Sequence, residues 1–314
     1  MAIFSSRKIG RPRLAPELDD KDLGNVLRTL LRTGTPLTSD IQIWQISNLM
    51  EETGNNWDRR AHRLLVLSRC AAETGLAALW CTREPVNADA LLFRAWVQLV
   101  RAKRRGGLQD SSIVVNDCYR VAELKPDDPT PWVALLGVMR ATRQRQQDVF
   151  RVWREVTARD PWHREAYWQM LAYLSPEECG SHLQAMEFLD IAQARMPTTA
   201  PTAALELTAM AHQYHKALAR GGVHAITAAS HWGHPLASAC LERARTRWCQ
   251  PGFLRHAAAL ADLNLLAYSL VAANRTSEAA EVFRSLNGVV THWPWLHRGD
   301  ALEEFKRWQA QALH

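Results

Sequence analysis

The residues whose types could do chemistry gather in one segment, which carries five histidines: His212, His215, His224, His231 and His234. Residues three apart share a face of a helix, so the pair His212 and His215 could bind one metal ion. Such a site needs further ligands, and local spacing fixes none, since Glu206 and Cys240 are arbitrary choices. We therefore expect surface and capping histidines, with no metal and no cofactor, and keep a metalloprotein or enzyme as an alternative.

Known catalytic motifs are otherwise missing from the sequence, which contains no Walker loop, no Gly-x-Ser-x-Gly elbow, no His-Glu-x-x-His and no Gly-x-Gly-x-x-Gly. The adjacent acids Glu177 and Glu178 fall in an expected turn between helices. Negative charge there is typical of a helix start, because it complements the helix dipole. A protein without catalytic activity is the preferred interpretation.

One cluster of arginines deserves a separate hypothesis, because Arg59, Arg60, Arg63 and Arg69 follow Trp57-Asp58 within a single predicted helix. Together they could bind an anion. Charged residues beside an apolar helix stripe are more typical of its solvated edge, and this is the interpretation we favour. The formal net charge of +6 is compatible with a nucleic-acid partner but does not require one.

The N-terminal segment is short and basic, and we expect residues 1–16 to form a flexible tail. Within it, Lys8-Ile9-Gly10-Arg11-Pro12-Arg13 resembles the AT-hook, whose Gly-Arg-Pro core lies in the minor groove of AT-rich DNA. The resemblance implies a nucleic-acid contact made by Arg7, Lys8, Arg11 and Arg13. Short basic segments are common, so a solvated tail is preferred and a nucleic-acid-associated regulator remains an alternative.

A helical-hairpin pattern repeats between Ala90 and Pro197. Its clearest copies have apolar residues at three- and four-residue spacing: Trp132, Leu135, Leu136 and Met139, then Val149, Trp153 and Val156; and Trp168, Leu171, Ala172 and Leu174, then Ala185, Leu189 and Ala192. Pro126, Pro161 and Pro197 close successive units. A further copy near the C-terminus has Leu263, Leu266, Ala267 and Leu270, then Ala279, Phe283 and Leu286. We expect these stripes to be buried between hairpins.

This pattern resembles the tetratricopeptide repeat (TPR), in which a terminal proline closes two helices with aromatic and small residues at fixed positions. The resemblance implies an all-α, TPR-like helical-hairpin solenoid whose concave surface binds a peptide or protein partner. It places five residues on that surface, several of them expected to be exposed to solvent: Arg140, Gln169, Tyr173, Asn264 and Tyr268. The Arg- and Ala-rich composition also resembles that of uncharacterised repeat proteins of GC-rich bacteria.

The expected organisation follows the repeat. After the tail come an N-terminal cap of about four helices (17–86), TPR-like repeats (87–197), a divergent His-rich segment (198–252) and a C-terminal repeat with a capping helix (253–314). The six cysteines form no Cys-x-x-Cys pair, which fits reduced thiols, and no apolar run is long enough to span a bilayer. These observations predict a cytoplasmic protein-interaction scaffold with an unknown partner and no membrane span.

Overall fold

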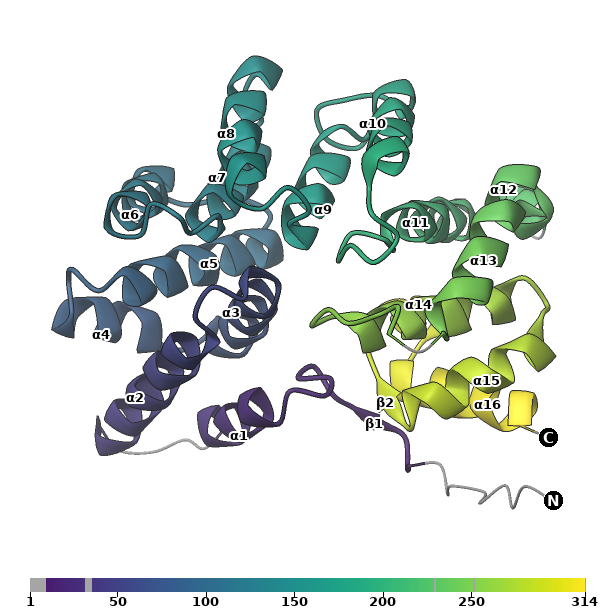
Figure 1. Cartoon of the computed structure of the whole chain (residues 1–314), viewed down its shortest axis with the longest axis horizontal. Helices are drawn as coiled ribbons and strands as arrows, with labels where there is room; N and C mark the ends of the chain where they lie inside the picture. The colour runs from purple at the N-terminus through teal and green to yellow at the C-terminus, as the bar shows by residue number, and fades with distance from the viewer. Residues whose placement is uncertain (1–9, 32–35, 229, 251, 314) are drawn as a thin grey trace. The chain divides into compact units, whose positions relative to one another are not determined.

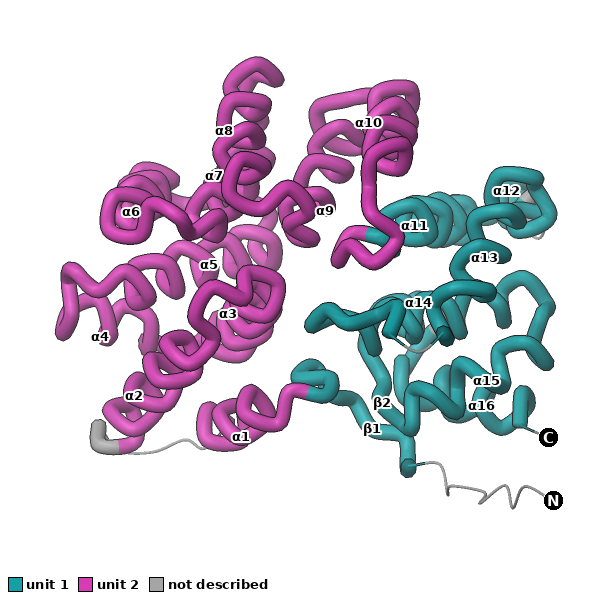
Figure 2. The backbone as a smooth tube through the Cα atoms, viewed as in Figure 1, with its two compact units in different colours: residues 1–19, 203–314 teal, residues 20–202 magenta. Residues whose placement is uncertain are grey.

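The computed structural model describes residues 10–31, 36–228, 230–250 and 252–313 (Figure 1). Within these ranges the chain forms 16 α-helices, two 3-10 helices and one pair of two-residue strands. The all-α prediction is therefore confirmed at the level of fold class. The chain divides into two compact units, unit 1 from Met1–Asp19 and Ala203–His314 and unit 2 from Asp20–Thr202 (Figure 2). In sequence, unit 2 is inserted between the two segments of unit 1.

Unit 2 contains ten helices among its described residues: α1 (Lys21–Leu30), α2 (Pro36–Thr53), α3 (Trp57–Ala71), α4 (Leu76–Arg83), α5 (Ala88–Arg105), α6 (Ser111–Leu124), α7 (Thr130–Ala141), α8 (Gln146–Arg159), α9 (Arg164–Tyr173) and α10 (His182–Arg195). Helices with odd numbers pack against one another in chain order, from α1 on α3 to α7 on α9. Neighbours along the chain also pack, such as α5 on α6 and α7 on α8. The odd-numbered helices of unit 2 thus form a continuous packed series.

Polar residues mark the starts of the odd helices of unit 2. Asp20, Asn56 and Asn87 each accept a hydrogen bond from a backbone N–H in the first turn of α1, α3 and α5. His163 caps α9 in the same way, and Asp128 accepts from the backbone N–H of Thr130 at the start of α7. These caps satisfy N–H groups that have no partner inside the helix. They also bring polar side chains to corresponding ends of neighbouring helices.

The core of α9 differs from the predicted stripe by a rotation of the helix. Tyr167 and Met170 are buried, whereas Trp168 and Leu171 are only half-buried. The ring of Tyr167 lies 4.9 Å from that of Trp153 and 5.6 Å from that of Phe188, so Tyr167 fills the space between helices. The guanidinium carbon of Arg164 lies instead over the Trp168 ring, 4.7 Å from the centre of that ring. The prediction that Trp168 is a buried core residue was therefore wrong.

Unit 1 combines six α-helices with the strand pair, again among its described residues: β1 (Arg13–Leu14), α11 (Leu205–Arg220), α12 (Gly222–Ala228), η1 (His231–Gly233), α13 (Pro235–Trp248), α14 (Ala259–Ala272), α15 (Thr276–Leu286), β2 (Val289–Val290), η2 (Trp295–Arg298) and α16 (Ala301–Leu313). Helix α14 packs against α15, and α15 against α16. Phe283, which the sequence places in the core, is fully buried between them. Rings of Trp295 and Phe305 surround it.

The two strands join the start of the chain to its C-terminal part. β1 and β2 run parallel, with Arg13 opposite Val289 and Leu14 opposite Val290. The backbone N–H groups of Arg13 and Ala15 donate to the carbonyls of Gly288 and Val290 at 2.9 and 3.0 Å. The prediction of a flexible tail was thus wrong for residues 10–16. Its partner strand lies far away in sequence, so local patterns could not reveal the pairing.

Apolar helices are covered by other helices. Residues 262–271 of α14 are all buried. In the part of the chain that the structure describes, no single helix is long and apolar enough to cross a bilayer. Helices α3 and α4 meet the criterion of length and composition only when taken together, and they bend by 113° where they join.

Candidate functional site

Arg60, in the first turn of α3, is buried and is held by two carboxylates. Its Nε lies 3.0 Å from Oδ2 of Asp128, and its Nη2 contacts the carboxylate of Asp89. The Arg60 side chain is 2% exposed and that of Asp128 is fully buried. Burial alone would lower the pKa of Arg60, but the two carboxylates outweigh it and the pKa is raised. Arg60 therefore stays charged and joins α3 to the starts of α5 and α7.

Arg63, one helical turn later, makes the equivalent connection to α1. Its Nε and Nη2 lie 2.7 and 3.0 Å from the two carboxylate oxygens of Asp20. Its Nη1 donates to Oγ1 of Thr53 at 2.8 Å and to the carbonyl of Leu49 at 3.0 Å, both on α2. Although burial opposes it, the hydrogen bonds from Arg63 and Leu23 lower the pKa of Asp20. A bidentate pair of this kind fixes orientation as well as charge.

The interpretation of this arginine cluster as a solvated edge was wrong for Arg60 and Arg63. Both are buried, and their charges are neutralised by carboxylates from other helices. Arg59 and Arg69 are exposed, as expected. The sequence did not indicate the acids that pair with the buried arginines. In the structure Asp20 and Asp128 stand just before α1 and α7, where capping residues occur.

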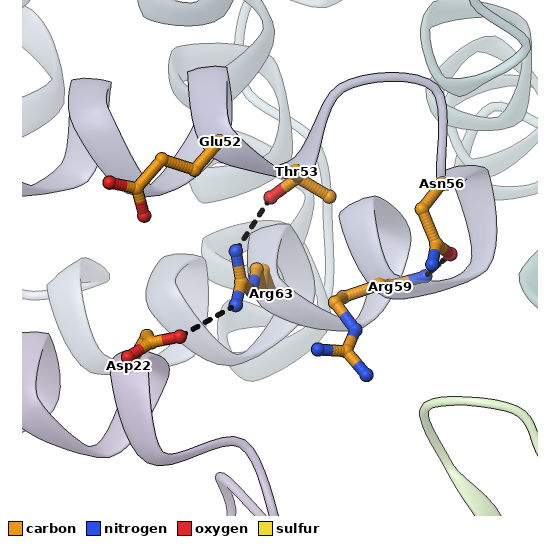
Figure 3. A pocket seen from close by; sticks show the side chains of 6 residues that line it. All are labelled: Asp22, Glu52, Thr53, Asn56, Arg59 and Arg63. Atoms are coloured by element: carbon orange, nitrogen blue, oxygen red, sulfur yellow. Dashed lines mark hydrogen bonds and ion pairs between the residues drawn. The ribbon is translucent and has the colours of Figure 1, made fainter.

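A charged hollow of about 290 Å³ opens beside Arg63. Six residues line it: Asp22, Glu52, Thr53, Asn56, Arg59 and Arg63 (Figure 3). Figure 3 shows no dashed line between the Arg59 guanidinium and either Glu52 or Asp22. Among the described residues, none forms an ion pair with Arg59. The hollow thus offers one uncommitted guanidinium beside two exposed carboxylates.

A second hollow of about 410 Å³ lies on the other side of the α2–α3 corner. Its lining includes Arg60, Asp89, Asp128 and Lys125. The ammonium of Lys125 lies 2.9 Å from Oδ2 of Asp89, so Lys125, Arg60 and their two aspartates are already paired. Glu51, an exposed carboxylate, is the remaining charged residue of this lining, so the hollow offers no uncommitted cation like Arg59.

The predicted concave residues of unit 2, Arg140, Gln169 and Tyr173, all make contacts within the unit. Arg140 pairs with Glu178 through Nε and Nη2, at 2.7 and 2.5 Å, and its Nη1 contacts the amide oxygen of Gln169. Tyr173 is 2% exposed, and its hydroxyl donates to the carbonyl of Gln144 at 2.7 Å. The expected exposure of Tyr173 was wrong, because the rotation of α9 turns it inward. These three residues join the turns of neighbouring hairpins.

Asn264 and Tyr268, predicted to be exposed in the C-terminal repeat, are also buried. The Asn264 amide donates to the carbonyls of Leu260 and Val289 at 2.8 and 3.1 Å. Its oxygen accepts from the Trp295 indole at 2.9 Å and from the Thr291 backbone at 3.3 Å. The Tyr268 hydroxyl lies 2.8 Å from Nε2 of His215. The prediction of exposure was wrong for both residues. Asn264 holds strand β2 in place, and the Tyr268 hydroxyl contacts His215 inside the unit.

Three histidines of the His-rich segment pack against other rings. His212 is exposed and stacks on Trp293, whereas His215 is buried and stacks on His297 with ring centres 4.3 Å apart. His231 packs against Tyr214. Over the described ranges, no group of three or more His, Cys, Asp or Glu side chains could hold a metal ion. The structure thus provides no support for a metal site at His212 and His215.

The AT-hook-like segment is occupied by strand pairing. Arg7 and Lys8 lie outside the described residues. Arg11 and Arg13 are exposed, and Arg13 pairs with Glu17 at 2.7 Å. An AT-hook lays this backbone into the minor groove, whereas here it is hydrogen-bonded to residues 287–290. Binding DNA through this motif would therefore require the strand to detach.

Comparison with known proteins finds no protein-family model, curated protein or solved structure that matches the chain. The geometry of the two units is accordingly the basis for assigning a function.

Proposed function

We propose that the chain is a non-catalytic protein-interaction scaffold in which unit 2 is a TPR-like helical-hairpin solenoid. The observation that carries this proposal is the packing of α1, α3, α5, α7 and α9 in chain order. Arrays in which each hairpin contacts its neighbours present an extended surface, and such surfaces serve as binding sites in solenoid proteins.

Buried ion pairs favour a rigid array. Arg60 and Arg63 connect α3 to the starts of three other odd helices. Because breaking a buried pair leaves an uncompensated charge, the hairpins resist displacement relative to one another. A surface held in one conformation loses less entropy when it binds, which suits a scaffold.

The partner contact is assigned to the hollow beside Arg59 in place of the residues around Tyr173. Arg59 carries an unpaired guanidinium, and Asp22 and Glu52 stand exposed around the same hollow. A peptide segment with neighbouring acidic and basic side chains would complement this arrangement, with its carboxylate on Arg59. Arginine is among the residues that most often anchor such interfaces.

Affinity purification from the native cell extract, followed by calorimetry with the purified partner, tests the proposal. Arg59→Ala should weaken partner binding by at least about fivefold, the effect of losing a modest anchor. Arg69→Ala is the matched control, since Arg69 is an exposed arginine of the same helix outside the hollow. Equal binding by both variants would place the contact elsewhere, and failure of the folded protein to enrich any partner would count against a scaffold.

A further inference from the structure

Strand β2 has two edges, and they are satisfied in different ways. One edge is held by the Asn264 side chain, which bonds the backbone of Val289 and Thr291. Asn264 belongs to α14, so this contact is independent of the N-terminal segment. The other edge receives Arg13 and Ala15 of that segment. The Asn264 side chain thus holds β2 from the edge opposite to the one that receives the N-terminal strand.

Two glycines allow the backbones to approach closely at the start of the pairing. The Gly10 backbone N–H donates to Oδ1 of Asn287 at 2.8 Å. A Cβ atom on Gly10 would lie 2.5 Å from the Asn287 carbonyl oxygen. A Cβ atom on Gly288, whose φ is +80°, would lie 2.5 Å from the Gly10 carbonyl oxygen. Because these contacts are with backbone, a larger side chain at either position has no room.

The N-terminal segment is built to pair on one edge only. Arg13 and Ala15 direct their N–H groups to β2, so alternate positions face away. Pro12 and Pro16 stand at two of these positions and have no N–H group. The arginine side chains of this segment contribute little to its binding, because Arg11 and Arg13 are exposed. The Ala15 side chain, by contrast, is fully buried. Attachment mainly through backbone, with a small pocket for a particular side chain, is how proteins bind extended peptides by strand addition.

From this geometry we propose that the edge of β2 is a strand-addition site for an extended Gly-x-x-x-Leu-Ala segment. Its occupant is the chain's own residues 10–15, bound in cis. The ligand and its receptor are covalently linked, so the effective concentration of the segment is high and a free peptide of the same sequence competes poorly. Weakening the cis segment should open the site to that peptide.

A labelled synthetic peptide with the sequence of residues 7–18 tests this site in the full-length protein by fluorescence anisotropy. Gly10→Val in the protein should disable the cis strand, and the peptide should then bind at least about tenfold more tightly than to the wild type, because the intramolecular competitor is removed. The same peptide carrying Gly10→Val should not bind. A peptide carrying Arg11→Ala should bind like the unmodified one, since Arg11 is exposed.

Hydrogen exchange in the unmodified protein provides a second measurement that does not depend on the folding of the variant. Unlabelled peptide at a concentration above the effective concentration of the cis segment, which is on the order of millimolar, should accelerate exchange at the Arg13 and Ala15 amides of the protein and leave α14 unaffected. The Gly10→Val peptide should cause no acceleration. Unchanged exchange with the unmodified peptide, or equal effects of both peptides, would overturn the proposal.

Discussion

In unit 2, the ion pairs of Arg60 and Arg63 lie between helices and out of contact with water. In unit 1, the ion-pair cluster around Arg245 and Arg275 lies near the surface. Arg60 and Asp128 are 2% and 0% exposed. In unit 1, Arg245 and Arg275 bridge Glu242 and Glu278, and these four side chains are 25–44% exposed. The chemical groups are the same. Their energetic consequences differ, since a buried charge without its partner is costly and a surface pair is screened by water and salt.

Strand β2 of unit 1 is held by a neutral amide, whereas the helices of unit 2 are joined by charged groups. The Asn264 amide makes four hydrogen bonds to α14, β2 and Trp295. An amide carries less desolvation cost than an ion pair, and it can hold an irregular strand through both donor and acceptor. Single substitutions in the two units should therefore differ in size and in their response to salt.

The largest effect is expected for Asp128→Ala. This substitution leaves Arg60 buried beside one carboxylate instead of two, so we expect the free energy of unfolding to fall by about 3–5 kcal/mol. Urea denaturation followed by circular dichroism measures the loss. Asp127→Ala is the matched control, because Asp127 is the adjacent acid and is exposed. If both variants unfold at the same urea concentration, the buried pair does not stabilise unit 2.

Asn264→Ala should have the next largest effect, at about 3 kcal/mol. It leaves the indole N–H of Trp295 and the backbone of Thr291 without their partner in a buried setting, at roughly 1–3 kcal/mol for each unsatisfied group. Chemical denaturation gives the stability, and hydrogen exchange at β2 locates the change. Gln311→Ala, an exposed amide of α16, serves as the control. A variant with wild-type exchange at Val289 and Val290 would show that β2 does not depend on Asn264.

These two residues also show what the sequence could and could not predict. Spacing of apolar residues predicted the helices, because periodicity is a local property. The pairing of Arg60 with Asp128 joins residues 68 positions apart, and the bond from Trp295 to Asn264 spans 31. Neither partner is visible from local spacing. The burial of Tyr173 depends on a small rotation of α9, which an aromatic-rich stretch from Tyr167 to Tyr173 does not specify.

A smaller effect is expected from two buried histidines of unit 2. Burial lowers the pKa of His62 to about 4, and it also lowers the pKa of His163. The unfolded chain binds a proton near pH 6.5, whereas the folded protein resists protonation until lower pH. The unfolded state therefore holds more protons between these values, so stability is lost as pH falls from about 6.5 toward 4.

Urea denaturation at pH 7.5, 6.0 and 4.5 measures this loss, which we expect to reach about 2–3 kcal/mol from His62 alone at the lowest pH. The double variant His62→Asn, His163→Asn should show a flatter dependence. Asn is suitable because it keeps the capping role of His163 at α9 while removing both titrations. A pH dependence as steep as that of the wild type would assign the loss to other groups.

The smallest effect is expected for Glu242→Gln in the surface cluster of unit 1. Hydrogen bonds from Arg245 and Arg275 lower the pKa of Glu242 to about 2, so it is ionised at neutral pH and its charge is lost on substitution. Exposed pairs contribute only about 0.2–1 kcal/mol, and the Debye length shrinks to about 3 Å in 1 M salt. The stability difference between Glu242→Gln and wild type should therefore nearly vanish in 1 M NaCl, as measured by thermal unfolding. The difference for Asp128→Ala should persist, because salt does not reach a pair buried between α3 and α7. Equal salt dependence in the two variants would mean that burial does not separate the ion pairs of the two units.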